Sequence, residues 1–127
     1  ALAMARILII DDEEPFRMML RQMLERAGHE VMEAFGGAMG ASLYREKPAD
    51  LLITDILMPG KDGLELIMEL RRDFPNIKVI AMSGGGRSGN LDFLPVASLF
   101  GAHRTFQKPF NRQELLAAIQ ELVSVQK

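Results

Sequence analysis

Hydrophobic positions along the chain follow two alternating patterns. Short, nearly continuous apolar runs are typical of strands buried on both faces, and they occupy residues 6–10, 51–54 and 78–82, with weaker runs at 30–34 and 105–107. Between these runs, apolar residues recur at helical spacing in segments 12–28, 36–48, 64–74, about 95–100 and after Asn111. The pattern is therefore a strand followed by a helix, repeated five times.

Local signals predict where these helices begin and end. Asp12 suits the N-cap of the first helix, and Gly28 suits the position just beyond its end. Leu94 precedes Pro95 and is disfavoured from helical geometry, which predicts that the fourth helix starts at Pro95. Asn111, followed three residues later by a glutamate, predicts the cap of the last helix. Buried strands alternating with amphipathic helices imply a parallel sheet, wound by right-handed crossovers into a three-layer α/β sandwich.

Composition and charge narrow the class of protein. The 127 residues contain no linker and predict one domain, 1–127, with Met4 as a candidate natural initiator after residues 1–3. A net charge of −2 gives no basic surface for nucleic acid or anionic lipid, and no apolar run approaches the ~20 residues of a membrane span. Cysteine is absent, which excludes thiolate metal sites and fits a reducing, cytoplasmic location.

Polar side chains stand where the predicted strands end. Asp11 and Asp12 follow the first strand, Asp55 the third and Ser83 the fourth, and Lys108 follows the fifth. Because function in doubly wound sheets gathers at the carboxyl ends of the strands, we expect these side chains to converge at one edge.

Three carboxylates need compensation if they lie together. One like-charge pair at ~4 Å costs ~4 kcal/mol at an effective dielectric of 20. The cluster must raise its pKa values, pair with Lys108 or hold a divalent cation, and oxygen ligands open to water suit Mg²⁺ better than Zn²⁺. With such a cation, Asp55 is placed to attack a phosphoryl group and become an acyl phosphate, while Lys108 and Ser83 contact the other phosphoryl oxygens.

The segments IIDDEE, TDILMPGKDG, MSG and FQKPF occur in this order over almost the whole chain. Together they resemble the receiver domain of response regulators in two-component signalling. The resemblance implies a flavodoxin-like (βα)5 fold with strand order 2-1-3-4-5. It gives the phosphoacceptor role to Asp55, the switch hydroxyl to Ser83 and the phosphoryl contact to Lys108. The Mg²⁺ ligands that it implies are Asp55, Asp11, Asp12 and the backbone carbonyl of Leu57.

The resemblance also implies partners. A sensor histidine kinase or histidine phosphotransfer protein would donate the phosphoryl group, and the domain would catalyse its own phosphorylation and slow hydrolysis without being a conventional enzyme. The output would pass to an effector, to an attached output domain or through a phosphorylation-dependent homodimer, so the chain is either a stand-alone receiver or a piece of a longer regulator or hybrid kinase. An alternative is a pseudo-receiver that binds proteins without being phosphorylated.

Two features depart from the family pattern. Ser83 and Lys108 are 25 positions apart (108 − 83), longer than is usual in the family, and the excess falls in the glycine-rich segment. Thr105 stands where the family usually has an aromatic switch residue, and Phe106 should point to the opposite face. We therefore predict that phosphorylation orders residues 84–94 instead of moving a ring, and, from the resemblance, that the peptide before Pro109 is cis.

Other interpretations are weaker. Singly, Asp12 is explained as a helix cap, Asp55 as a turn residue, Ser83 as loop polarity and Lys108 as a surface lysine, but these explanations do not account for the ordered set. The segment GGGRSG at 84–89 matches a dinucleotide-binding glycine motif, yet it follows the fourth strand and lacks the acidic residue that should follow.

Overall fold

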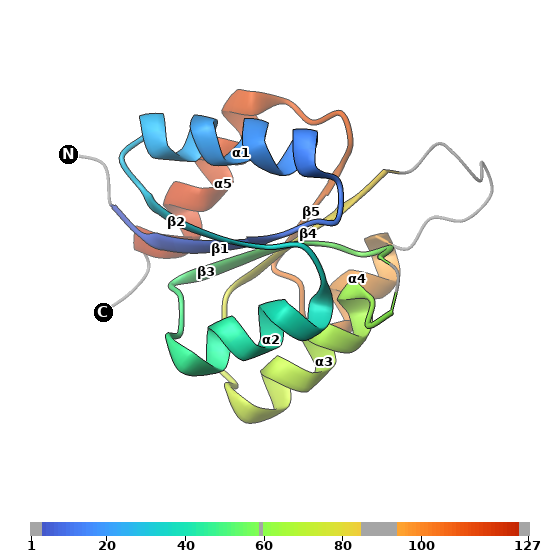
Figure 1. Cartoon of the computed structure of the whole chain (residues 1–127). Coiled ribbons are helices and arrows are strands. Elements are labelled where there is room, and N and C mark those ends of the chain that lie inside the picture. Colours follow the sequence, from blue (N-terminus) through green and yellow to red (C-terminus); the bar gives the residue numbers. More distant parts are fainter. Residues whose placement is uncertain (1–3, 59, 85–93, 125–127) are drawn as a thin grey trace.

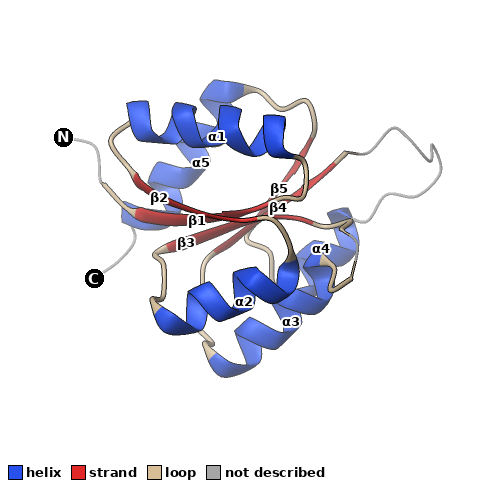
Figure 2. Cartoon of the chain, in the orientation of Figure 1, coloured by secondary structure: helices blue, strands red, loops and turns tan. Residues whose placement is uncertain are grey.

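The computed structural model describes residues 4–58, 60–84 and 94–124. Five parallel strands form one sheet in the order β2-β1-β3-β4-β5. Helices α1 and α5 cover one face of this sheet, and α2, α3 and α4 cover the other (Figure 1). Figure 2 shows the sheet in red between the two blue helical layers. The predicted α/β sandwich and its strand order are confirmed.

The strands and helices have the following bounds. The strands are β1 (Arg6–Ile10), β2 (Glu30–Ala34), β3 (Leu51–Asp55), β4 (Val79–Ser83) and β5 (Arg104–Gln107). The helices are α1 (Glu14–Arg26), α2 (Gly37–Glu46), α3 (Gly63–Asp73), α4 (Leu94–Phe100) and α5 (Arg112–Ser124).

Alternation along the buried strands divides the core into two halves. In β1, Ile7 and Ile9 face α1 and α5, whereas Leu8 and Ile10 face α2 and α3. All four side chains are at most 1% exposed, and burying each contributes about 1.5–3 kcal/mol. The continuous apolar run seen in the sequence is thus that of a strand covered on both faces.

Several predicted boundaries differ slightly from those observed. β3 and β4 each run one residue further than predicted, because Asp55 and Ser83 still take part in the ladder: the N–H of Ile56 donates to the carbonyl of Met82 at 2.9 Å, and the N–H of Lys108 donates to that of Ser83 at 2.7 Å. Two residues that the site needs are therefore the last residues of strands.

Two predicted helix starts were wrong. Asp12 does not cap α1: the N-cap is Glu13, without a side-chain cap, and its N–H donates instead to Oδ1 of Asp11 at 2.9 Å. Helix α4 begins at Leu94, one residue before the predicted start.

Other local predictions are confirmed. Asn111 accepts from the N–H of Glu114 at 2.9 Å, so it caps α5, and Gly28 has a φ of 97° just beyond α1. The peptide between Lys108 and Pro109 is cis. The predicted ordering of residues 84–94 falls largely outside the described residues.

The two faces of β5 lie as the alternation predicts. Thr105 pairs with Ala81, which belongs to the core half facing α2, α3 and α4. Phe106 pairs with Met82 and packs against the core half facing α1 and α5. Phe106 therefore cannot take the place of an aromatic residue at Thr105.

A glycine allows α3 to approach the end of β3 closely. A Cβ built at Gly63 would lie 2.1 Å from the carbonyl oxygen of Asp55, and the N–H of Gly63 donates to the carbonyl of Ile56 at 2.8 Å. The N-cap Asp62 accepts from the N–H of Glu65 at 2.9 Å. The start of α3 is thus fixed against the strand that carries Asp55.

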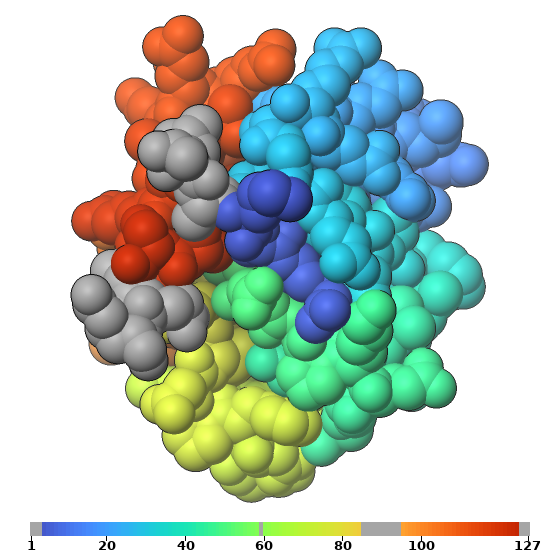
Figure 3. Space-filling view, turned by 90° about the vertical axis from the view of Figure 1, so that its left-hand side faces the viewer, coloured from blue at the N-terminus to red at the C-terminus, as the bar shows by residue number. Residues whose placement is uncertain are grey.

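The amino ends and the carboxyl ends of the parallel strands lie on opposite sides of the molecule. Figure 3 views the side on which both termini lie, where the dark-blue start of the described chain lies beside the light-blue segment between α1 and β2. The carboxyl ends of the strands lie at the opposite edge.

In the part of the chain that the structure describes, no helix has the length and apolarity needed to cross a bilayer.

Candidate functional site

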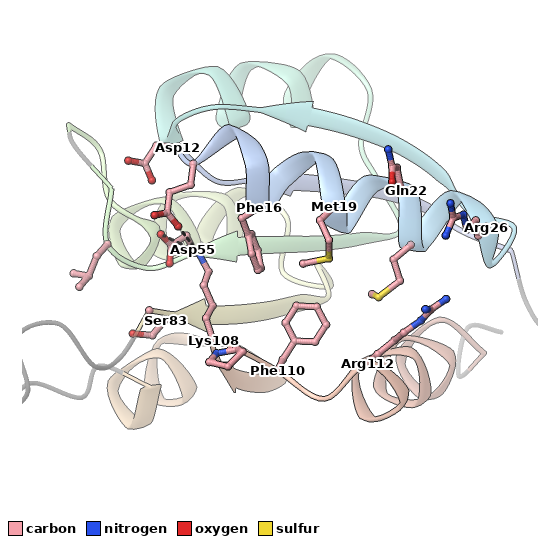
Figure 4. Close-up of a pocket in the computed structure, with 15 residues that line it drawn as sticks. Asp12, Phe16, Met19, Gln22, Arg26, Asp55, Ser83, Lys108, Phe110 and Arg112 are labelled. Atoms are coloured by element: carbon pink, nitrogen blue, oxygen red, sulfur yellow. Dashed lines mark hydrogen bonds and ion pairs between the residues drawn. The ribbon is translucent and has the colours of Figure 1, made fainter.

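Three carboxylates meet at the carboxyl edge of the sheet. Asp11 and Asp12 follow β1, Asp55 ends β3, and each offers an oxygen within 4.8 Å of the others. Asp11 and Asp55 are 3% and 7% exposed, whereas Asp12 is open to solvent. The convergence predicted from the strand ends is confirmed (Figure 4).

Lys108 supplies the nearest positive charge. Its Nζ lies 2.7 Å from Oδ2 of Asp11, 3.4 Å from Oε1 of Glu13 and 3.8 Å from Oδ2 of Asp55. The ammonium also lies 4.1 Å from the centre of the Phe16 ring, a favourable cation–π distance. Burial lowers the pKa of Lys108, but the hydrogen bond to Asp11 and the surrounding carboxylates outweigh it and raise this pKa, so the side chain stays cationic.

Asp55 has the most perturbed ionisation in the site. Its Oδ1 accepts from the N–H of Ile56 at 3.0 Å. Burial is the main reason that the pKa of Asp55 is raised to about 7, and the like charges of Asp11 and Asp12 add to it, against the opposing effects of Lys108 and the Ile56 N–H. The protein thus compensates the cluster both by pairing with Lys108 and by raising one pKa.

Ser83 and Leu57 complete the predicted set. Ser83 is 2% exposed at the end of β4, and Leu57 follows β3 with a half-exposed side chain. Both line the groove that also contains Asp12, Asp55 and Lys108. In Figure 4 the Ser83 side chain lies close to Asp55 and Lys108.

The donor set fits Mg²⁺. Among the described residues, three carboxylates face one ammonium, so negative charge is in excess, and all the ligand atoms are hard oxygens partly open to water. Asp11, Asp12 and Asp55 are the residues that would hold the ion. Burial is the main cause of the raised pKa of Asp55, and a bound cation would favour the ionised form of this carboxylate.

The groove continues well beyond the carboxylates. It has a volume of about 1000 Å³ and runs from Asp55 along α1 toward the start of α5. Phe16, Met19 and Phe110 line its middle, and the two rings meet edge to face with centres 6.0 Å apart. Gln22, Arg26 and Arg112 lie at the far end (Figure 4).

The sequence pattern did not predict this groove. Met19 belongs to the apolar residues that recur at helical spacing in segment 12–28, yet it is 44% exposed on α1. Phe110 lies between β5 and α5, and Arg112 is the first residue of α5. Helical spacing does not show what residues at these positions contact.

Comparison with known proteins agrees with this geometry. The family described as the response regulator receiver domain matches residues 7–120. The chain belongs to the response regulator receiver family. Phosphoaspartate and Mg²⁺ are typical of these receivers, which act in two-component systems.

Individual receivers resemble the chain over most of its length. It is 33% identical over 118 residues to chemotaxis protein CheY of Thermotoga maritima, covering 92% of this chain and 96% of that protein. It is 29% identical over 116 residues to sporulation initiation phosphotransferase F of Bacillus subtilis, covering 91% of each. The crystal structure of a response regulator receiver domain protein from Clostridium thermocellum superposes with a TM-score of 0.87 at 32% identity, over 95% of each chain.

Receivers also occur within longer relatives. In four other curated proteins the chain spans 46%, 24%, 51% and 13% of the relative's length, and the last of these is a sensor kinase from Brucella abortus. The receiver fold is therefore found both nearly alone and joined to other domains.

Proposed function

We propose that this receiver accepts a phosphoryl group on Asp55 from a phosphohistidine donor. The observation that carries the proposal is the ionisable cluster itself: a buried carboxylate with a pKa of about 7, grouped with two other carboxylates and faced by Lys108. Such an arrangement costs stability, and it is typical of sites kept for chemistry.

In the proposed transfer, an ionised oxygen of Asp55 attacks phosphorus. The phosphorus–nitrogen bond of the donor breaks, its electron pair stays on the imidazole, and that ring takes up a proton from water. Lys108 remains cationic and contacts a phosphoryl oxygen, while the Ser83 hydroxyl donates to another. Bound Mg²⁺ would supply positive charge for the phosphoryl oxygens and hold Asp55 ionised at neutral pH.

Return to the resting state needs only water. A water oxygen attacks the phosphorus of the acyl phosphate, the bond to the Asp55 oxygen breaks, and inorganic phosphate leaves. Asp55 is 7% exposed, so water has restricted access to its bond with phosphorus, and we expect the release to be slow.

We further propose that the donor lies along the groove between α1 and the start of α5. The apolar middle of the groove fits the apolar face of a donor helix, and the histidine would enter at Asp55. Arg26 and Arg112, at the far end, would pair with acidic residues of that helix. We expect the downstream partner to bind other surfaces of the domain.

Phosphorylation is tested with a small donor. The protein is incubated with acetyl phosphate and Mg²⁺, and its intact mass is measured. We expect the gain of one phosphoryl group in the wild type and no gain in Asp55→Asn. No gain in the wild type would instead favour a pseudo-receiver that binds partners without being phosphorylated. An equal gain in the variant would place the phosphoryl group on another residue and would also contradict the proposal.

A further inference from the structure

Arg17, in the first turn of α1, contacts the residue that follows β1 and a residue of β2. Its side chain is 13% exposed. The guanidinium Nη1 donates to the backbone carbonyl of Asp11 at 2.8 Å, and Nε donates to Oε1 of Glu33 at 2.8 Å. Arg17 thus joins the end of β1, where the carboxylate cluster begins, to the edge strand β2.

Asp11 is held at every polar group. Its N–H donates to the carbonyl of Ala34 at 3.1 Å, and its carboxylate accepts from Lys108 and from the N–H of Glu13. Arg17 holds the remaining group, the carbonyl. Because the start of α1 has no side-chain cap, this contact helps to fix the connection that carries both Asp11 and Asp12.

Glu33 explains why the guanidinium stays in place. It lies on the same face of the sheet as Ile9, its register partner, beneath α1, where an unpaired carboxylate would be costly. Burial raises the pKa of Glu33, but hydrogen bonds from Arg21 and Arg17 outweigh it and lower this pKa. The ion pair orients Arg17 with its second donor toward Asp11.

Arg21 provides a natural comparison. It lies one turn further along α1 and also pairs with Glu33, and it contacts Glu25 at 3.0 Å. Within the described ranges 4–58, 60–84 and 94–124, Arg17 is the arginine that donates to Asp11, and Arg21 has no such bond. Both residues carry a positive charge and pair with Glu33. The hydrogen bond to the Asp11 carbonyl is made by Arg17 and not by Arg21, and it is the difference that their variants test.

From these contacts we infer that Arg17 is a positioning residue for the metal-binding carboxylates. It acts through the carbonyl of Asp11 and holds Asp11 and Asp12 where their oxygens meet that of Asp55. The inference deepens the proposed function and rests on it in one respect, that this cluster binds Mg²⁺. Nothing in it requires Arg17 to touch the phosphoryl group.

The sign of the effect separates positioning from charge. If Arg17 acted only by its charge, removing it would strengthen Mg²⁺ binding, because one cation near the site would be lost. If it positions Asp11, removing it weakens binding. Loss of a partner that orients a metal ligand typically costs at least about tenfold in affinity.

The test is Mg²⁺ binding by calorimetry to the metal-free full chain in Arg17→Met and Arg21→Met. We expect a dissociation constant about tenfold higher in Arg17→Met and close to that of the wild type in Arg21→Met. Unchanged or tighter binding in Arg17→Met overturns the inference. Equal weakening in both variants also overturns it, because the loss would then follow the Glu33 pair.

The variant Arg17→Lys allows the same test if Arg17→Met does not fold. Arg17→Lys keeps the charge and can pair with Glu33, but an ammonium lacks the planar fork that reaches two partners in fixed directions. If Arg17→Met does not fold, Arg17→Lys carries the test: weaker Mg²⁺ binding supports the inference, and wild-type affinity overturns it.

Failure of the proposed function gives a different result. A wild type that binds Mg²⁺ but gains no phosphoryl group refutes phosphorylation, and the comparison of Arg17→Met with Arg21→Met still decides the inference. A wild type that is phosphorylated, with Arg17→Met binding Mg²⁺ normally, refutes the inference alone. A wild type that does not bind Mg²⁺ refutes both.

Discussion

At Asp55, burial and two neighbouring carboxylates raise the pKa from 3.8 to about 7. Because the folded pKa lies above the unfolded one, the fold loses stability as pH rises from about 4 through 7. We therefore expect Asp55→Asn, without Mg²⁺, to raise the free energy of unfolding at pH 8 by on the order of 2 kcal/mol and to leave it nearly unchanged at pH 4. Urea unfolding across this pH range measures the difference.

The exposed carboxylate Glu46 is the matched control for this change. Glu46→Gln removes an exposed carboxylate that is not part of the cluster, and it should leave the free energy of unfolding close to that of the wild type at both pH values. If Asp55→Asn and Glu46→Gln behave alike, the ionisation of Asp55 does not strain the fold.

Lys108 is the second residue whose charge the site depends on. Lys108→Met leaves Asp11 and Asp55 without the ammonium that faces them, and it removes a phosphoryl contact. We expect the rate of phosphorylation by acetyl phosphate to fall by about 100-fold, the usual cost of losing one group that stabilises developing charge. The rate is followed by intact mass at a saturating Mg²⁺ concentration.

Lys61→Met is the control for removing a lysine. Lys61 pairs with Glu69 on α3, and among the described residues it forms no ion pair with the three carboxylates of the cluster. Its loss should leave the rate close to that of the wild type. A rate for Lys108→Met that matches that of Lys61→Met would show that the ammonium has no part in the transfer.

At the scale of elements, the start of α3 lies directly against the end of β3. Gly63→Ala places a methyl group 2.1 Å from the carbonyl oxygen of Asp55 and 2.8 Å from Cα of Ile56, and neither backbone atom can move freely. We expect a loss of about 1–3 kcal/mol in the free energy of unfolding, with slower phosphorylation because Asp55 is displaced. Thermal unfolding and the acetyl phosphate reaction measure the two effects.

Gly36→Ala, at the N-cap of α2, is the matched control. Gly36 has a φ of −169°, which any residue adopts, and a Cβ there meets no atom within 4 Å. Because alanine is a poorer N-cap than glycine, we expect a small loss of stability, clearly below that of Gly63→Ala. Equal destabilisation by the two substitutions would mean that the close contact at Gly63 is not the cause.

The strands were predictable from sequence because β1, β3 and β4 are buried on both faces and therefore appear as continuous apolar runs. The strands β2 and β5 are only partly buried, and their apolar runs are weaker. Their last residues were harder, since polar Asp55 and Ser83 look like the start of a loop although their neighbours continue the ladder. Asp12 was predicted as a cap because aspartate before a helix usually is one. Here the carboxylate of Asp11 accepts a hydrogen bond from the Glu13 N–H, and Asp12 contributes an oxygen to the carboxylate cluster instead.

The site was predictable as a set of residues, and its surroundings were not. Strand order and the rule that carboxyl ends share an edge bring Asp11, Asp55 and Lys108 together without any knowledge of side-chain packing. The contact between Arg17 and the Asp11 carbonyl depends on a pair with Glu33 from another element. Sequence spacing shows that Arg17 lies on α1, but it does not show what the side chain reaches.

At the scale of the whole molecule, the two edges of the sheet respond to pH in opposite directions. The carboxyl edge holds the carboxylates, whose strain grows as pH rises. At the amino edge, Nδ1 of His29 accepts from the N–H of Ala5 at 3.1 Å, and Nδ1 of His103 accepts from the N–H of Val79 at 3.2 Å. Each imidazole must be neutral at Nδ1 to accept.

Burial is the first cause that lowers the pKa of both histidines, and nearby Lys78, Arg71 and Arg104 add to the effect at His103. A folded pKa below the unfolded value of 6.5 gives stability that is present above pH 6.5 and is lost as pH falls. His29 is 5% exposed, so its protonation would place a charge in the core and break its bond to Ala5. The amino edge should therefore limit stability in acid.

This loss is best measured in an Asp55→Asn background, because the opposite contribution of Asp55 over the same pH range is then absent. We expect the free energy of unfolding of that protein to decline from pH 6.5 to 5, and His29→Asn to remove the larger part of the decline. The asparagine oxygen can still accept from Ala5 but does not titrate. His103→Asn should remove a smaller part, since His103 is exposed. If the decline is unchanged by both substitutions, its source lies outside the amino edge, and the neutral histidines are only structural acceptors.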